Sequence, residues 1–441
     1  MSQPPTSALS GLGPLLNAAL DGDRAARWRV QVFVVTWIAY AGFYLTRQNY
    51  TVAQLDFIGE LGWTKEQIGV ISSTYLAVYA FGQFFNGVLV DKVGSRALLT
   101  FGFVLTGAMS IGLGFSSTIP MMTLLYGING FAQSTGWPSA ARAMTLWTPV
   151  GVRGRVMGLW GTNYQVGSAA SQAVAAFLIG VAVIGWRGTF VLPGVAAMAL
   201  AAMVLFGLRD RPEDLGLPPT EPTEPTEPTG QAEGSEQPGS GRLLWDTLEV
   251  LLQRRVLTLG LSYFCLKFVR YTFMFWIGFY LVEQHHLSTQ DAAYAQVAFP
   301  LAGALGSVLS GWISDRFFQA RRAPPALMML GGLALGLVVL ALAPPLPLPQ
   351  LAALLGAVGV LLYGPDMLIA GTAAMDFGSA KAAGRVVGFV NGMGSLGAVV
   401  QGLAVGYVSD AFGWKAVFGL LVAMVCIGSA ILGTLWSDKG R

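Results

Sequence analysis

Twelve runs of mainly apolar residues, separated by short polar breaks, leave this chain few ways to fold. A helix needs about 20 such residues to cross the hydrocarbon core of a bilayer, and each run is close to that length. The composition agrees, because 54% hydrophobic and 11% charged residues and a mean hydropathy of +0.59 are too apolar for a soluble chain of 441 residues. We therefore expect an all-α membrane protein with twelve transmembrane helices. The predicted spans are Val30 to Thr51, Gln67 to Val90, Ala97 to Phe115, Met121 to Ala141, Val156 to Val181, Thr189 to Leu208, Val256 to Val282, Ala292 to Ser314, Ala326 to Ala343, Leu351 to Ala374, Val386 to Tyr407 and Ala416 to Trp436.

A long polar segment at 209–255 divides the runs into two sets of six. Its three EPT triplets, followed by Gly, Ser and Gln residues, are typical of an extended start and a flexible remainder. We interpret it as a tether between two pseudo-symmetric six-helix bundles at 30–208 and 256–436, with a docking site for a partner as the alternative. Residues 1–29 and 437–441 are predicted to be tails, and no cleavable signal is recognised before the first run.

Positive charge is concentrated in the even-numbered loops between the runs. These loops carry DKVGSR, DRFFQARR and the residues Arg142, Arg153, Arg155, Lys381 and Arg385. The odd-numbered loops hold only Lys65, Arg187 and Lys415. Because Lys and Arg of short loops stay on the cytoplasmic side, the even loops, both termini and the 209–255 segment are predicted to be cytoplasmic.

The two sets of runs also repeat one another in sequence. GVLVDKVGSR at Gly87, GRVMG at Gly154 and GWRGTF at Gly185 return, at a nearly constant offset, as GWISDRFFQARR at Gly311, GRVVG at Gly384 and GWKAVF at Gly413. A similar offset relates Arg47 in YLTRQNY to Arg270 in LKFVRYTFMFW. In transporters built from repeats the substrate site lies near the bilayer midplane between the repeats, which predicts that the two arginines converge there.

Three basic residues stand inside apolar runs, where a charge is costly and usually functional. Arg47 lies toward the end of its run, so a side chain that reaches the membrane interface is an alternative interpretation. Arg270 lies near the middle of its run, and Lys267 lies one helical turn away on the same face. The acid at comparable depth is Asp366, in YGPDMLIAG. We expect Asp366 to pair with Lys267, and the alternative is a proton site at Asp366.

These charges do not balance, and the imbalance indicates an anionic ligand. Two arginines and a lysine against one aspartate leave positive charge in a place of low dielectric, which is costly unless an anion binds. The planar guanidinium donates two parallel hydrogen bonds to phosphate or carboxylate and keeps its proton. A tetrahedral dianion held from both halves is therefore the predicted ligand.

Other patterns do not indicate a catalytic, metal or nucleotide site. GMGSLG, at Gly392 to Gly397, lies within an apolar run and is interpreted as a helix contact rather than a dinucleotide loop. No Walker A loop, acid pair or nucleophile beside a base occurs, so we expect neither an enzyme nor a cofactor. His285 and His286 are adjacent and expected in an outer loop without metal, and Cys265 and Cys426 are expected to pack between helices. The net charge of +3 is spread out and does not indicate nucleic acid.

Several of these stretches resemble a known family of carriers. GVLVDKVGSR is similar to the loop signature between the second and third helices of the major facilitator superfamily. YLTRQNY, GINGFAQSTGWPSAARAM, RVMGLW, FVRYTF and YGPDMLIAGTAAMDFGSAKAAGRVVGF resemble its organophosphate:inorganic phosphate antiporters, over about Arg27 to Phe418. The resemblance implies a twelve-helix fold of two bundles, with phosphate bound by Arg47 and Arg270. It also implies a pathway lined by the tyrosines Tyr40, Tyr44, Tyr79 and Tyr363.

The surroundings of the two arginines depart from the glycerol-3-phosphate carriers of that family. Where those carriers have two lysines, a histidine, two pathway acids and a tyrosine, this chain has Gln48, Gln83, Tyr164, Phe275, Pro300 and Lys267. We therefore do not assign glycerol phosphate as the substrate of this chain. The predicted substrate-binding residues are Arg47, Arg270, Lys267, Tyr40, Tyr44, Tyr79, Gln48, Gln83, Tyr164, Tyr363 and Asp366.

We expect a carrier in the cytoplasmic (inner) membrane that exchanges an organic phosphate or a related anion for inorganic phosphate by alternating access. It is expected to act as a monomer, without cofactor, metal or nucleic acid, and its partners are the small anion, inorganic phosphate and the lipid bilayer. Two alternatives stay open. One is a membrane-embedded organophosphate sensor that signals through a partner kinase, and the other is a proton-coupled carrier of a carboxylate with Asp366 as the proton site.

Overall fold

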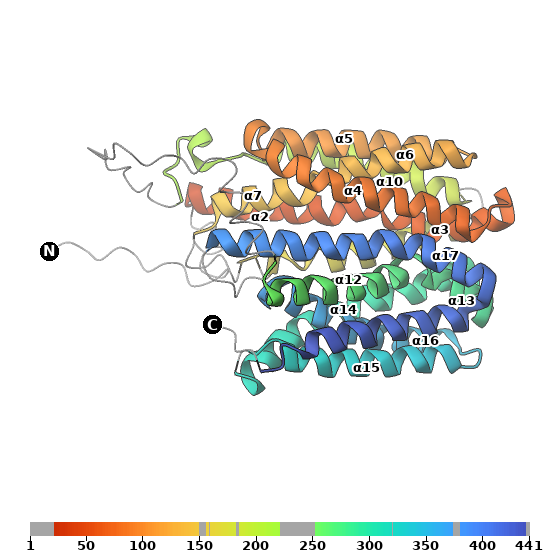
Figure 1. The fold of residues 1–441 in the computed structure, drawn as a ribbon. Helices are drawn as coiled ribbons and strands as arrows, with labels where there is room; N and C mark the ends of the chain where they lie inside the picture. The colour runs from red at the N-terminus through yellow and green to blue at the C-terminus, as the bar shows by residue number, and fades with distance from the viewer. Residues whose placement is uncertain are drawn as a thin grey trace.

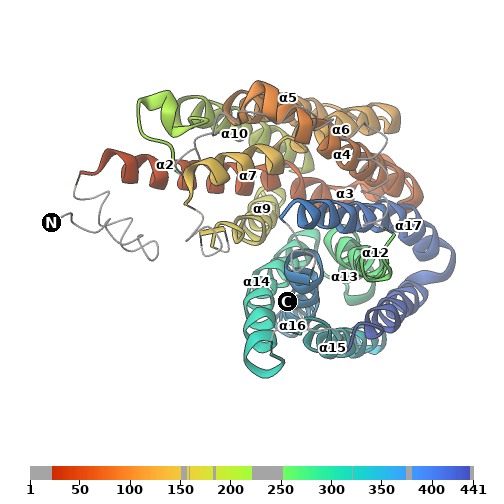
Figure 2. The ribbon, with the colours of Figure 1, turned by 60° about the vertical axis from the view of Figure 1, so that its left-hand side comes forward.

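Every regular element in the described part of this computed structural model is a helix. The described residues are 22–149, 156–157, 159–181, 185–220, 252–319, 321–373 and 380–437. Figures 1 and 2 show two groups of helices lying side by side, with the elements up to α10 in one group and those from α12 onward in the other. This arrangement confirms the predicted all-α fold of two bundles. The middle of the predicted tether, with its EPT triplets, lies outside the described residues.

The first group of helices carries the first six predicted spans. Two of these spans are broken into shorter helices, the first span near Arg47 and the fourth at Ser134 and Thr135. The elements are α2 (Arg24–Phe43), the 3-10 turn η1 (Tyr44–Thr46), α3 (Gln48–Leu61), α4 (Lys65–Val93), α5 (Ser95–Gly114), α6 (Ile119–Gln133), α7 (Gly136–Trp147), α9 (Asn163–Gly180), α10 (Gly185–Gly207) and the 3-10 turn η2 (Pro212–Leu215).

The second group carries the last six predicted spans. The helices α12 and α13 are bent by 55° relative to each other, and α17 contains two spans that meet at Gly413, where φ is +75°. The elements are α12 (Arg254–Phe275), α13 (Ile277–His285), α14 (Thr289–Phe317), α15 (Ala323–Leu342), α16 (Leu348–Met367), the π-helix η3 (Leu368–Ala373) and α17 (Ala380–Gly433).

Not every predicted span is a single long helix. Seven helices are long and apolar enough to cross a membrane, or eight if the bent pair α12 and α13 is one span. The other predicted spans are the two broken ones in the first half, the more polar α9 and the second part of α17. Each predicted run thus lies mainly in helix wherever the structure describes it.

The internal repeat is visible in the helices themselves. α4 and α14 both contain 29 residues, and α5 and α15 both contain 20. α4 and α14 also begin in the same way, because the hydroxyls of Thr64 and Ser288 accept hydrogen bonds from backbone N–H groups of the first turn. Arg47 and Arg270 accordingly lie on the first span of their respective halves.

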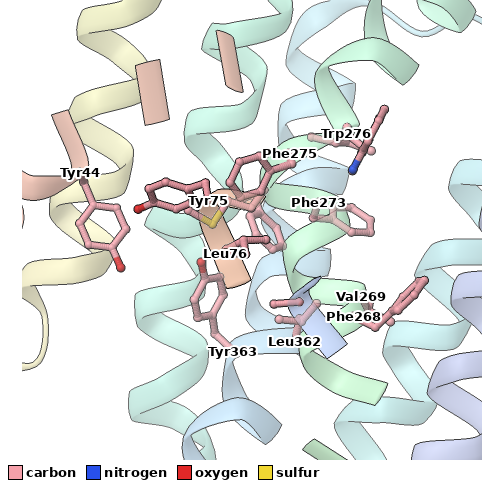
Figure 3. Close-up of a cluster of buried hydrophobic side chains, with 14 of the residues drawn as sticks. Tyr44, Tyr75, Leu76, Phe268, Val269, Phe273, Phe275, Trp276, Leu362 and Tyr363 are labelled. Atoms are coloured by element: carbon pink, nitrogen blue, oxygen red, sulfur yellow. The ribbon is translucent and has the colours of Figure 1, made fainter. Parts of the chain in front are cut away.

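The two halves share one apolar core. Buried residues of the first half, such as Tyr44 and Tyr75, belong to the same cluster as Phe273 and Tyr363 of the second half. Figure 3 shows this cluster, with the side chains of α12 and α16 gathered on one side and Tyr44 on the other. The substrate-binding residues predicted from sequence therefore lie next to a continuous packed interior.

Glycines let α17 approach α12 closely. A Cβ atom on Gly397 would lie 2.2 Å from the carbonyl oxygen of Phe264, and one on Gly394 would lie 2.5 Å from the ring of Tyr263. On Gly392, in contrast, the nearest atom would be 3.8 Å away. The interpretation of GMGSLG as a helix contact is confirmed, because two of its glycines meet α12 where no larger residue fits.

Gly397→Ala is expected to destabilise the protein, because the new methyl group would collide with backbone rather than with a flexible side chain. Overpacking of this kind costs about 1–3 kcal/mol. The measurement is the thermal unfolding of purified protein in detergent, with Gly392→Ala on the same helix as the matched control. Equal unfolding midpoints for the two variants would contradict the packing described here.

At one end of the molecule the two halves are fastened together. This end, where α3 finishes at Leu61 and α13 at His285, is called the closed end and lies on the right of Figure 1. Lys65, at the start of α4, forms an ion pair with Glu283 of α13 at 2.8 Å. The indole N–H of Trp414 donates a hydrogen bond to the same carboxylate, also at 2.8 Å. Lys65 also lies 3.8 Å from the carboxylate of Asp410 on α17, so the first half is tied to two elements of the second.

Backbones also meet at the closed end. Gly69 of α4 and Gly402 of α17 cross so tightly that a Cβ on Gly69 would lie 2.5 Å from the carbonyl oxygen of Gly402. The side chain of Gln54 in α3 donates a hydrogen bond to the carbonyl of Phe275 in α12. Contacts this close require the two halves to be in direct apposition at this end.

Two predictions about His285 and Cys426 are wrong. His285 is not in a loop, because it is the buried last residue of α13. Its imidazole contacts the Tyr280 hydroxyl at 2.9 Å and accepts a hydrogen bond from the Leu346 N–H at 3.0 Å. Cys265 is buried as predicted, but Cys426 is exposed on α17. An apolar run does not tell which face of its helix is turned to the protein interior, so the second cysteine could not be placed from sequence.

Candidate substrate-binding site

Arg47 lies at the break in the first membrane span, between η1 and α3. The break frees backbone carbonyls, and neighbouring side chains bind them. Asn129 donates to the carbonyl of Thr46 at 3.1 Å, and the Tyr126 hydroxyl donates to the carbonyl of Arg47 at 3.2 Å. The hydroxyl of Ser171 donates to the carbonyl of Tyr44 at 2.6 Å. Unpaired carbonyls are very costly inside a membrane, so these bonds from α6 and α9 stabilise the break.

The side chain of Arg47 is buried in the protein and does not reach the membrane interface. Only 4% of the residue is exposed. Its Nε donates to the side-chain oxygen of Gln133 at 2.9 Å, and the Tyr75 hydroxyl donates to that same oxygen at 2.9 Å. Its guanidinium carbon lies 4.8 Å from the ring centroid of Tyr44 and 4.7 Å from that of Tyr79.

The terminal nitrogens of Arg47 are its most informative feature. Within the described part of the chain, Nε is the only atom of this guanidinium with a hydrogen-bond acceptor, and no carboxylate forms an ion pair with Arg47. The aromatic faces offer cation–π attraction but no acceptor for a directed hydrogen bond. The two terminal nitrogens therefore remain available to a ligand that accepts two parallel bonds.

Arg270 lies on α12 in the other half and is also buried. Its Nη1 pairs with the Asp366 carboxylate of α16 at 2.9 Å. Its guanidinium carbon lies 4.6 Å from the ring centroid of Tyr363 and 5.4 Å from that of Tyr164 on α9. Arg270 thus makes contact with a residue of the first half.

The predicted pair of Lys267 and Asp366 is wrong, because Asp366 pairs with Arg270. Lys267 instead lies over the rings of Tyr263 and Tyr271, with its ammonium nitrogen 5.1 and 5.4 Å from their centroids. Both basic residues lie on the same face of α12, and the helix geometry brings the longer, forked side chain to the carboxylate. The pair uses one nitrogen and one oxygen only, since Nε of Arg270 and Oδ1 of Asp366 are buried without a partner in the described structure.

The basic residues of the two halves converge on one region. Tyr44 of the first half lies over Arg47. Tyr164 of the first half and Tyr363 of the second, whose ring centroids are 6.4 Å apart, both lie over Arg270. Tyrosine rings thus lie over both arginines, and the basic side chains here outnumber the one carboxylate that pairs with them.

The fold agrees with the family comparison. Residues 32–400 and 259–440 match the family model described as Major Facilitator Superfamily. The chain belongs to the major facilitator superfamily. A bacterial homologue of the human lysosomal transporter Spinster, in its inward-facing and unoccupied form, shares the fold with a TM-score of 0.75 at 16% identity, over 94% of this chain and 99% of that one. The nucleoside transporter NupG aligns with a TM-score of 0.70 at 12% identity, over 93% of this chain and 100% of that one.

Curated relatives of this superfamily member are similar over nearly their whole length. The probable hexose phosphate transport protein of Chlamydia pneumoniae is 31% identical over 420 residues, 93% of this chain and 91% of its own. The glycerol-3-phosphate transporter of Bacillus subtilis is 30% identical over 94% of each chain. The membrane sensor protein UhpC of Salmonella typhimurium is 30% identical over 95% of this chain and 94% of its own. These relatives place this multi-pass membrane transporter in the organophosphate:inorganic phosphate antiporter branch; it is not an enzyme.

Two glutamines predicted to bind substrate form hydrogen bonds with other side chains of the protein instead. The amide of Gln48 donates to the Ser168 hydroxyl at 2.6 Å, which ties the start of α3 to α9. The amide of Gln83 donates to the Tyr79 hydroxyl at 3.0 Å. Gln83 therefore orients a tyrosine that lies over Arg47, whereas Gln48 fixes the break beside Arg47.

Tyr40 belongs to an aromatic group next to the site. Its ring centroid lies 6.2 Å from that of Tyr44, 5.6 Å from Trp137 and 5.8 Å from Trp160. Tyr44 in turn lies over the guanidinium of Arg47. Tyr40 is thus one ring removed from the arginine and supports Tyr44.

Sequence reasoning missed the polar residues that hold Arg47, namely Tyr75, Asn129 and Gln133. A signal for two of them was present. Asn129 and Gln133 lie one turn apart in the apolar stretch GINGFAQ, and polar residues at that spacing share a helix face. In the structure they are joined by a hydrogen bond of 3.3 Å. Two amides on one face of a membrane helix indicate a partner, which here is the broken first span.

Proposed function

We propose that this transporter exchanges an organic phosphate, such as a sugar phosphate or glycerol phosphate, for inorganic phosphate by alternating access. The observation that carries the proposal is Arg47, a buried guanidinium whose two terminal nitrogens lack a hydrogen-bond acceptor among the described residues. A phosphate group offers the paired oxygens that such a fork binds. Two bacterial relatives, a probable hexose phosphate transport protein and a glycerol-3-phosphate transporter, support a phosphorylated substrate.

Binding follows from the positions of the two arginines. Arg47 donates two hydrogen bonds to the phosphate from the first half, and Arg270 adds its remaining N–H groups from the second. Asp366 holds Arg270 in place before the anion arrives, so that the site is organised in advance. Tyr44, Tyr79 and Tyr363 exclude water from the phosphate with their rings. Each half therefore contributes one principal ligand to the same anion.

Entry takes place from the end opposite the closed end. The ion pair of Lys65 with Glu283 and the crossing of Gly69 with Gly402 seal the closed end, so the anion reaches the arginines from the end where α2 starts. The excess of Lys and Arg in the even loops favours a cytoplasmic position for this end, which fits a carrier of the inner membrane. We propose that both termini lie on that side. A single chain supplies both arginines, so a monomer suffices.

Exchange rather than free movement follows from the charges. Closing the empty site around unpaired cations would add about 4 kcal/mol to the barrier, which slows reorientation about a thousandfold. A bound anion removes this cost. The carrier therefore changes sides only when it is loaded, and each outward step of one anion is matched by an inward step of another.

Counterflow in proteoliposomes tests the proposed function. Vesicles loaded with unlabelled phosphate are expected to accumulate labelled phosphate, and external sugar phosphate or glycerol phosphate should compete. Vesicles loaded with chloride instead of phosphate should show no uptake of labelled phosphate. Uptake that is independent of internal phosphate would refute obligatory exchange.

A sensor is the second candidate, because the relative named membrane sensor protein UhpC is 30% identical over 423 residues. A sensor would bind the organic phosphate at the same arginines without rapid exchange. The two functions separate in one preparation. Ligand-induced thermal stabilisation without phosphate counterflow would favour the sensor, and both together would favour the carrier.

A further inference from the structure

Both histidines of the chain lie at the closed end, His285 as the last residue of α13 and His286 directly after it. Histidine is the side chain that ordinarily changes charge between pH 5 and 8. His286 is exposed, whereas only 5% of His285 is exposed. The proposed exchange of anions uses neither imidazole, and the buried one is held by other parts of the second half.

The hydrogen bonds of His285 fix both its tautomer and its charge. The single proton of the Tyr280 hydroxyl is donated to the carbonyl of Leu340 at 2.5 Å. At its 2.9 Å contact with Nε2 of His285 the hydroxyl oxygen therefore accepts, and Nε2 carries a proton. Nδ1 carries none, because it accepts a hydrogen bond from the backbone N–H of Leu346 at 3.0 Å. The closed arrangement thus requires a neutral imidazole.

A second proton on this imidazole would have to bind Nδ1. It would then point at the N–H of Leu346, so that a hydrogen bond between α13 and the segment before α16 would become a contact between two donors. The chain on that side offers no counter-charge, because residues 323–362 contain no titratable side chain. The closed arrangement therefore binds fewer protons than one in which His285 is released, and acid favours the release.

His285 is connected to the ion pair that joins the two halves. Its partner Tyr280 packs edge-on against the indole of Trp414, with ring centroids 5.8 Å apart. The Trp414 N–H donates a hydrogen bond to the carboxylate of Glu283 at 2.8 Å. Glu283 lies two positions before His285 on α13 and pairs with Lys65 of the first half at 2.8 Å. Release of the last turn of α13 therefore displaces the carboxylate that holds Lys65.

We propose that His285 is an acid-sensitive switch of the closed end: protonation of its imidazole frees α13 from the segment before α16 and lets the two halves separate there. In the proposed orientation this end faces the outside of the cell, so external acid favours the outward-open carrier. The switch lies outside the substrate site and does not depend on which anion is carried.

Several other charged or titratable groups lie at this end. They are Asp56 and Glu60 of α3, Lys65 and Glu66 of α4, Tyr280, Glu283 and the neighbouring His286 at α13, Asp291 of α14, and Asp410 and Lys415 of α17. Besides the ion pairs of Lys65, the carboxylate of Asp56 joins the halves, because it accepts a hydrogen bond from Thr289 at 3.0 Å. A substitution of His285 separates its effect from that of the carboxylates.

The distance between the two halves at the closed end tests the proposal. Spin labels on Gly59→Cys of α3 and Ala411→Cys of α17, both exposed, report this distance in purified protein that carries Cys265→Ala and Cys426→Ala. A Cβ on Gly59 would have no atom within 4 Å, so a label fits there. As the pH falls from about 8 to about 5.5, the ratio of long to short distances is expected to rise about tenfold, the scale of one lost buried hydrogen bond.

His285→Gln is expected to abolish this pH dependence, because the glutamine amide offers a donor and an acceptor without titrating. His286→Gln, the matched control at the next position, should keep it. Three results would overturn the switch: no response in the parent protein, a response that survives His285→Gln, or a response that is lost in His286→Gln. The second of these would assign the response to the carboxylates.

Nitrogen NMR of isotope-labelled histidine gives a second measurement, which also decides if His285→Gln does not fold. At a pH of about 8 the buried imidazole is expected to be neutral with its proton on Nε2, and His286→Gln identifies its signal. A charged imidazole, or a proton on Nδ1, would contradict the proposal. Neither measurement involves phosphate. A pH response without phosphate counterflow would keep the switch and refute the exchange, and counterflow without a pH response would do the reverse.

Discussion

Arg47→Lys is expected to lower phosphate exchange by at least about a hundredfold, equivalent to about 2.7 kcal/mol. Lysine keeps the charge but loses the planar fork, and its flexible ammonium cannot donate two parallel bonds to one phosphate. The change also removes the hydrogen bond from Nε to Gln133. Arg270→Lys is expected to lower phosphate exchange by a similar factor, because Arg270 must bind Asp366 and the anion at the same time.

The matched control for these variants is Arg254→Lys, at the exposed start of the same helix as Arg270. It should leave counterflow unchanged. All three variants should insert in the membrane and elute as monodisperse protein in size-exclusion chromatography. Normal exchange by either Arg47→Lys or Arg270→Lys would remove that arginine from the substrate site.

Asp366→Asn is expected to destabilise the empty protein strongly, because it leaves the Arg270 guanidinium buried without a counter-charge. Breaking a buried ion pair from one side costs about 3–5 kcal/mol. Added phosphate can replace the missing carboxylate beside Arg270. The variant should therefore unfold at a lower temperature than the wild type without phosphate, and phosphate should stabilise the variant more than it stabilises the wild type.

The control for this experiment is another salt bridge of the same chain. Asp315 pairs with Arg322 at 2.7 Å, but the Asp315 side chain is 66% exposed, and exposed pairs contribute only about 0–1 kcal/mol. Asp315→Asn should barely change the unfolding temperature. A different outcome would make Asp366 a proton site: the Asp366→Asn variant would unfold at the wild-type temperature, keep exchange and lose only the pH dependence of uptake. The ion pair would then contribute nothing to the stability of the protein.

The sequence by itself determined the fold class, the repeat and the two arginines. Run length and composition demand membrane helices, because only long apolar segments satisfy the bilayer core. The constant offset between the halves singled out Arg47 and Arg270 as equivalent positions, and the structure places both in the interior. These properties depend on order along the chain, which a sequence displays directly.

Only the tertiary structure decided which partners the charges have. Lys267 and Arg270 share a helix face, and spacing alone cannot tell which of them reaches Asp366, because the answer depends on the rotation and separation of α12 and α16. The break at Arg47 was equally hidden, since YLTRQNY contains no proline or glycine. It exists because Asn129 and Tyr126, far away in the chain, bind the carbonyls that the break exposes. Hydrogen bonds and ion pairs act over a few ångströms, so their partners are set by packing rather than by position in the sequence.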